Sequence, residues 1–253
     1  MLHAGRVRSR LKSDMKAISL LSVLAAVVVL GPAESAFAAS GEDGVALAII
    51  YDTSGSMRES VKDESGKQAP KYVIANRALV AITRQLESFA TNTASGTPRK
   101  IQAGLFIFGD NGAKEVVKFS PFDGKAMREW AKNFSNPQGN TPLGNALKKA
   151  AQTVMESPLA RKHVLVITDG INTSGPAPSA VMRKLKQQAE QKGTSLAVHF
   201  VAFDVDAKVF ESVKQQGATV VGAADERQLK TQLDYIMQKK ILLEEEEPAK
   251  KSN

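Results

Sequence analysis

The chain has 253 residues, of which 43% are hydrophobic and 24% are charged, which is the composition of an ordinary globular protein. Its formal net charge of +8 is mild, and its aromatic content of 6% comes without the interleaving of basic and aromatic residues seen in nucleic-acid-binding proteins, so we expect no nucleic acid partner. The absence of cysteine excludes disulfides, thiolate metal sites and lipid attachment at a signal-peptide cysteine.

The first 38 residues have the three parts of a secretory signal peptide. Five basic residues precede the apolar run Ala17 to Leu30, and the polar stretch that follows ends in the tripeptide Ala36-Phe37-Ala38. A membrane anchor is the alternative, but a span needs about 20 apolar residues, and this run is broken by Gly31-Pro32. We therefore expect residues 1–38 to be cleaved and the protein to be exported, periplasmic or secreted, with no stable membrane span after cleavage.

Strands and helices are predicted to alternate after a linker at residues 39–43. The domain is expected to span residues 44–241, and a charged, disordered tail to occupy residues 242–253. Apolar runs predict strands at Val45–Tyr51, Ile101–Phe108, Val116–Phe119, Val164–Thr168, Leu196–Phe203 and Thr219–Val221. Helical spacing of apolar residues predicts helices at Lys71–Phe89, Ala126–Phe134, Pro142–Met155, Ser179–Lys192, Ala207–Gln215 and Glu226–Ile241, with a polar loop from Arg58 to Ala69.

This alternation predicts an α/β fold. Parallel strands joined through helices require right-handed crossovers, which give a doubly wound, mostly parallel central sheet with helices on both faces. Strand Val116–Phe119 can pair with the strand before it across Gly109-Asp110-Asn111-Gly112. It is expected to add one short antiparallel edge strand.

Oxygen-bearing side chains gather where two of the predicted strands end. Asp52, Ser54 and Ser56 stand at alternate positions directly after the first strand, and Asp169 closes the apolar strand that begins at His163. The carboxyl ends of strands in open α/β sheets are the edge at which ligands bind.

Together with Thr141, which lies in the polar loop before a helix, these four residues resemble the metal-ion-dependent adhesion site of von Willebrand factor type A domains. That site has the pattern D-x-S-x-S, then a threonine, then an aspartate, and all five positions are filled here in order. The resemblance implies a Rossmann-like fold with the metal at the upper crest of the sheet. It also implies that Ser54, Ser56 and often Thr141 contact the metal directly, while Asp52 and Asp169 act through water.

Two carboxylates and three hydroxyls form an oxygen-only ligand set, which selects hard cations. We expect Mg²⁺, with Mn²⁺ or Ca²⁺ as alternatives. Mg²⁺ is favoured over Ca²⁺ because Ca²⁺ prefers six to eight ligands. Neutral ligands leave the ion most of its charge, and in this family the ion attracts an Asp or Glu of a partner protein. The resulting hypothesis is an exported, metal-dependent protein-binding module for adhesion or assembly, and not an enzyme.

Each motif also has a plainer interpretation. Thr141 can be the N-cap of a helix, Asp169-Gly170 a turn, and Asp52-Thr53-Ser54 a strand-to-helix connection. His163 and His199 are expected to be core or strand-end residues. A domain with a degenerate site is a further hypothesis.

The alternative function is a metal-dependent, phosphatase-like hydrolase that uses Asp52. Phosphatases of the haloacid dehalogenase type place a second Asp two residues after the first, where this chain has Ser54. The sequence also contains no Gly-x-Ser-x-Gly elbow and no phosphate-binding Gly-Lys-Ser/Thr loop.

The signal-peptide prediction is checked by sequencing the N-terminus of the exported protein. We expect it at or near Ala39, whether synthesis starts at Met1 or at Met15. An envelope-associated form that still contains Leu20 would instead identify a membrane anchor.

Overall fold

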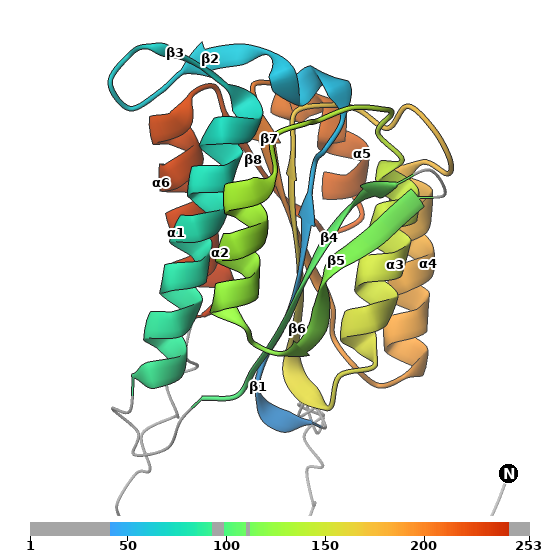
Figure 1. Cartoon of the computed structure of the whole chain (residues 1–253). Coiled ribbons are helices and arrows are strands. Elements are labelled where there is room, and N and C mark those ends of the chain that lie inside the picture. Colours follow the sequence, from blue (N-terminus) through green and yellow to red (C-terminus); the bar gives the residue numbers. More distant parts are fainter. Residues whose placement is uncertain (1–40, 93–98, 110–111, 243–253) are drawn as a thin grey trace, which may run out of the picture. The chain divides into compact units, whose positions relative to one another are not determined.

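A six-stranded sheet forms the centre of the protein in a computed structural model that describes residues 41–92, 99–109 and 112–242 (Figure 1). The predicted signal peptide and the tail from residue 243 lie outside the described residues. Within the described ranges, no helix is long and apolar enough to cross a membrane.

The sheet is mostly parallel, as predicted. Its strand order is β5-β4-β1-β6-β7-β8, and only the pair β4–β5 is antiparallel. The antiparallel edge strand was expected to be short but has 10 residues. The strands are β1 (Glu42–Tyr51), β4 (Ile101–Gly109), β5 (Gly112–Pro121), β6 (Leu159–Thr168), β7 (Ala197–Phe203) and β8 (Thr219–Ala223).

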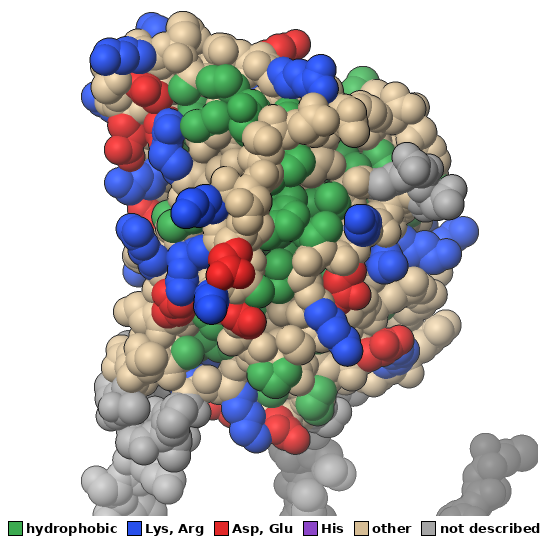
Figure 2. Space-filling view, in the orientation of Figure 1, with side chains coloured by type: hydrophobic (Ala, Val, Ile, Leu, Met, Phe, Trp, Pro, Cys, Tyr) green, Lys and Arg blue, Asp and Glu red, His purple; other side chains and the backbone are tan. Residues whose placement is uncertain are grey.

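Helices cover both faces of the sheet (Figure 1). One layer consists of α1 (Lys71–Thr91), α2 (Gly124–Asn133) and α6 (Glu226–Ile236), and the other of α3 (Leu143–Met155), α4 (Pro178–Gln191) and α5 (Glu211–Lys214). The doubly wound architecture predicted from the sequence is therefore confirmed. On the face of the molecule in Figure 2, hydrophobic side chains gather between α2 and β5, and charged side chains of both signs are interspersed around them.

Strand β1 is buried on both sides, which explains its continuous apolar sequence. Alternate residues from Val45 to Tyr51 belong to the core beneath α1, α2 and α6. The residues between them, Ala46, Ala48 and Ile50, pack in the core that contains α3. The small side chains on the second face let α3 approach the sheet closely. Its Gly144 also leaves no space for a side chain, because a Cβ atom there would lie 1.9 Å from the carbonyl oxygen of Pro176.

The prediction of a polar loop from Arg58 to Ala69 is wrong. It contains the end of a 3-10 helix, η1 (Gly55–Arg58), and a two-stranded hairpin of β2 (Ser60–Lys62) and β3 (Gln68–Pro70). The hairpin lacks an apolar run: within β2 only Val61 is buried in the core, and the turn is anchored by polar contacts to α6. The backbone N–H of Glu64 donates to Glu226 at 3.0 Å, and Arg227 donates to the carbonyl of Glu64 at 2.8 Å.

Two predicted helices also differ in form. The helix expected at 207–215 is divided into a 3-10 turn, η2 (Ala207–Phe210), and the short α5. The last turn of the final predicted helix is π-helical, η3 (Met237–Ile241). Both are local changes of winding that leave the order of elements as predicted.

Two buried histidines face each other between β6 and β7. Nδ1 of His163 lies 3.2 Å from Nε2 of His199, and the rings are stacked with their centroids 5.5 Å apart. Burial lowers the pKa of His163 to about 3 and that of His199 to about 4. Both rings are therefore neutral at pH 7 and form part of the core.

The histidine pair should make the protein less stable in mild acid. The pKa of each ring is lower in the folded state than in the unfolded chain, where it is about 6.5. The unfolded state therefore binds more protons below pH 6.5, and the stability that is fully present above this pH is lost as the pH falls toward 4. Between pH 7 and pH 5 we expect a loss of about 2 kcal/mol for each histidine, measured by urea unfolding.

The control is the double variant His163→Gln, His199→Gln. Because glutamine does not titrate, the free energy of unfolding of this variant should change less over the same interval. An equal change in the parent and in the variant would contradict the prediction.

Candidate metal centre

Three loops meet at the carboxyl end of the parallel strands: the loop after β1, the loop that leads into α3, and the loop after β6. The N–H of Gln138 donates to the carbonyl of Thr53 at 2.7 Å, which joins the first two loops. The N–H of Thr173 donates to the carbonyl of Thr141 at 3.0 Å, and the N–H of Thr141 donates to Oγ1 of Thr173 at 2.8 Å, which joins the second and third. These bonds place Thr141 next to the two strand ends.

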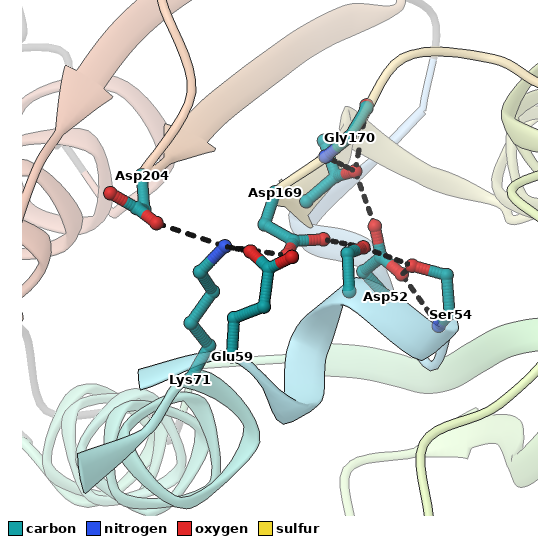
Figure 3. A network of polar contacts seen from close by, with 9 residues as sticks. Asp52, Ser54, Glu59, Lys71, Asp169, Gly170 and Asp204 are labelled. Carbon is teal, nitrogen blue, oxygen red and sulfur yellow. Dashed lines mark hydrogen bonds and ion pairs between the residues drawn. The ribbon is translucent and has the colours of Figure 1, made fainter. Parts of the chain in front are cut away.

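Four of the five predicted ligands form a chain of polar contacts, in which each serine hydroxyl donates its one proton to an aspartate and the two serine oxygens lie side by side. Asp52, Ser54 and Asp169 of this chain are labelled in Figure 3. Ser54 donates from Oγ to Oδ1 of Asp52 at 2.5 Å, and its Oγ lies 3.1 Å from Oγ of Ser56. Ser56 donates in turn to Oδ1 of Asp169 at 2.8 Å. The chain runs from the end of β1 to the end of β6, which are adjacent strands in the sheet.

The fifth residue, Thr141, has its hydroxyl beside this chain. A Cβ atom at Gly170 would lie 3.6 Å from Oγ1 of Thr141 and 3.9 Å from Oγ of Ser56. The N-cap of α3 is Pro142, which has no capping side chain, and the N–H of Gly144 in the first turn donates instead to Oδ1 of Asn172 at 3.1 Å. The Thr141 hydroxyl is therefore not used as a helix cap, which was the plainer interpretation of this residue.

Asp52 is held in an unfavourable environment for a carboxylate. Its side chain is fully buried, and burial together with the charge of Asp169 raises its pKa to about 6. Hydrogen bonds from Ser54 and Thr168 oppose this rise, and the Thr168 hydroxyl donates to Oδ2 of Asp52 at 2.5 Å. Two repelling carboxylates among hydroxyl oxygens are a suitable environment for a cation, which would relieve the repulsion.

Sequence reasoning missed a lysine on the other side of Asp169. Lys71, the first residue of α1, has a side chain that is 3% exposed. Its Nζ lies 3.0 Å from Oδ2 of Asp169, 2.8 Å from Oε2 of Glu59 and 2.9 Å from Oδ2 of Asp204 (Figure 3). Burial alone would lower the pKa of Lys71, but the hydrogen bonds to these carboxylates outweigh it and raise that pKa.

The sequence contained a signal for some of the acidic residues around Lys71. The adjacent strands β1, β6 and β7 are each followed at once by an aspartate, namely Asp52, Asp169 and Asp204. Because the three strands are parallel, their following residues gather at one edge. Thr168 could be noticed in the same way, as the polar residue that directly follows the apolar run Val164–Ile167.

A cavity of about 600 Å³ opens beside the predicted ligands. Amide side chains and apolar side chains line it, and the described residues of the lining carry no charge. The lining consists of Thr53, Ile107, Phe108, Phe134, Asn136, Gln138, Gly139, Asn140, Pro142 and Ser174.

The donor set fits a hard cation and does not fit a soft one. Among the described residues, no three His, Cys, Asp or Glu side chains are arranged to hold a metal ion. A cation at this edge would therefore depend on the hydroxyls of Ser54, Ser56 and Thr141 as well as on the two aspartates. Such an oxygen set suits Mg²⁺ or Mn²⁺.

Comparison with known families decides the classification. The model of the von Willebrand factor type A domain matches residues 46–235. This chain belongs to the von Willebrand factor type A domain family. The matched segment includes β1 from Ala46 onward, the other five strands of the sheet and all five residues of the candidate site. The type A fold has the sheet and helix layers described above.

Individual relatives are distant. The uncharacterized protein YwmD of Bacillus subtilis is 25% identical over 207 residues, which are 76% of this chain and 82% of YwmD. Among solved structures, the PilB minor pilin of Streptococcus sanguinis has a TM-score of 0.57 at 16% identity, covering 78% of this chain and 61% of PilB. Proximal thread matrix protein 1 of the mussel byssus, solved with zinc in its MIDAS motif, has a TM-score of 0.53 at 16% identity. That match covers 78% of this type A chain and 48% of the byssus protein.

Removing either carboxylate should weaken metal binding without unfolding the sheet. We expect Asp52→Asn and Asp169→Asn to lower the affinity for Mn²⁺ by at least about tenfold, as measured by calorimetric titration. The fold should persist, because asparagine keeps the shape of the side chain and removes one of two repelling charges.

Asp123→Asn is the matched control. Asp123 caps α2, which follows β5, and the end of β5 pairs with the beginning of β4. This residue therefore lies at the opposite end of the sheet from the candidate site. Equal Mn²⁺ affinity in the parent and in both site variants would refute the assignment of Asp52 and Asp169 to a metal site.

Proposed function

We propose that this type A domain is an exported module that holds a divalent cation, preferentially Mg²⁺, and binds a protein partner through it. An Asp or Glu of the partner would complete the coordination of the ion. The observation that carries the proposal is the chain of polar contacts from Asp52 through Ser54 and Ser56 to Asp169, with the Thr141 hydroxyl beside it. Zinc in the MIDAS motif of the byssus relative supports a divalent ion at this place in the fold.

The existing hydrogen bonds favour hydroxyls as the direct ligands. Both oxygens of Asp52 are already occupied, Oδ1 by Ser54 and Oδ2 by Thr168. Both oxygens of Asp169 are occupied as well, Oδ1 by Ser56 and Oδ2 by Lys71. Carboxylates that keep these partners are suited to act through water. An ion held mainly by neutral oxygens retains the charge that attracts an acidic group.

The surface around the ion site offers further contacts for a partner. Ile171 follows Asp169 by two residues and is 55% exposed, more than most large hydrophobic side chains of soluble proteins. The cavity lined by Thr53 and Asn140 lies next to the same loops, and the lining residues that the structure describes are uncharged. A partner segment with an acidic residue flanked by uncharged side chains would match this surface.

Export is part of the proposal and depends on residues 1–38, which lie outside the described residues. Its support is the basic start, the apolar run and the tripeptide Ala36-Phe37-Ala38.

Thr141 should contribute more to the affinity for the partner protein than to the affinity for the metal ion. The site already has four other oxygen residues, so Thr141→Ala is expected to lower the Mn²⁺ affinity only modestly. The same variant should reduce capture of a partner from an envelope extract much more strongly, because the family resemblance assigns Thr141 to the ion when the acidic group arrives. Thr141→Ser, which keeps the hydroxyl, should behave as the parent does.

The same preparations distinguish a binding module from the hydrolase. Capture should depend on Mg²⁺ and disappear with a chelator. Phosphate-ester and peptide substrates should not be turned over, since a hydrolase would need a general base beyond the two aspartates. Metal-dependent turnover that is lost in Asp52→Asn, without any captured partner, would establish the enzyme instead.

A further inference from the structure

Lys71 lies in a place that is unfavourable for a lysine. It is the first residue of a 21-residue helix, where the helix dipole disfavours a positive charge. Its side chain is 3% exposed, and a buried ammonium group is costly unless it is paired. A buried cation at this position therefore calls for an explanation in terms of its partners.

The backbone of Asp204 is arranged to supply one of those partners. Its φ of +54° is the only positive φ of a non-glycine residue among those that the structure describes. This left-handed conformation is sterically unfavourable for most residues, and such strain concentrates at functional sites. Here it accompanies a carboxylate that lies 2.9 Å from Nζ of Lys71.

The lysine divides the two oxygens of Asp169 between different partners. Oδ2 accepts from Lys71 at 3.0 Å, and Oδ1 accepts from Ser56 at 2.8 Å. Only Oδ1 therefore faces the chain of hydroxyls, and the positive charge lies on the far side of the carboxylate (Figure 3).

We propose that Lys71 is a positioning residue of the ion site, which weakens the binding of the cation and strengthens the binding of a carboxylate to the bound cation. This inference rests on the proposed function. By binding Oδ2, Lys71 prevents Asp169 from coordinating the ion with both oxygens. By its charge, it offsets part of the negative charge around the ion, so that an incoming acidic group meets less repulsion.

The test measures two binding constants for each variant, that of Mn²⁺ and that of acetate for the Mn²⁺-loaded protein, both followed by water proton relaxation. Lys71→Met removes the charge and keeps the length of the side chain. We expect Mn²⁺ to bind more tightly, on the order of tenfold, and acetate to bind more weakly by a similar factor. Lys71→Arg keeps the charge and should leave both constants near those of the parent.

Asp204→Asn provides the opposite change, and it keeps the proposal testable if Lys71→Met does not fold. Asparagine tolerates positive φ, and Asp204 is partly exposed, so this variant should fold. It removes a negative charge and leaves the charge of Lys71 less compensated. Mn²⁺ should therefore bind more weakly and acetate more tightly than in the parent.

Opposite movements of the two constants support the inference. If the parent binds Mn²⁺ but the two constants change in the same direction in the variants, or do not change, the inference is overturned and the proposed function is not. A parent that binds no Mn²⁺ would overturn the proposed function and the inference with it.

Discussion

The repulsion between two carboxylates at the ends of adjacent parallel strands governs the upper edge of this protein. Asp52 is fully buried and Asp169 nearly so, and burial together with the charge of Asp169 raises the pKa of Asp52. Each polar group nearby reduces this repulsion, since Thr168 and Ser54 donate to one carboxylate, and Ser56 and Lys71 donate to the other. The candidate function follows from the same constraint, because a cation is the most direct way to compensate two negative charges held close together.

The core keeps these charges from moving apart. Strand β1 is hydrogen-bonded to β4 on one side and to β6 on the other, so the end of β1 cannot shift without breaking both ladders. The close approach of α3, with Gly144 against the carbonyl of Pro176, fixes the loop before α3 relative to the loop after β6. The polar edge is thus held by the strand ladders below it and by the close contact between two of its own loops.

The sequence was sufficient for features that depend on local pattern. Apolar runs predicted the six strands in order, and the pattern through Asp52, Thr141 and Asp169 predicted which loops the fold would bring together. It was not sufficient where tertiary contacts decide. The β2–β3 hairpin has no apolar run and depends on polar contacts with α6. Lys71 could not be assigned to the site from the sequence, because two of its carboxylate partners, Asp169 and Asp204, follow strands far away along the chain.

The position of β1 in the middle of the sheet has a mechanical consequence. The amino end of β1 lies at the end of the sheet opposite the ion site, since the strand runs from Glu42 toward Asp52. A partner bound through Asp52, Ser54 and Ser56 would therefore pull on the carboxyl end of this strand, along its length and away from the rest of the sheet. Its hydrogen bonds to β4 and β6 would be loaded in shear and would have to break together, which is the loading geometry in which a sheet resists force best.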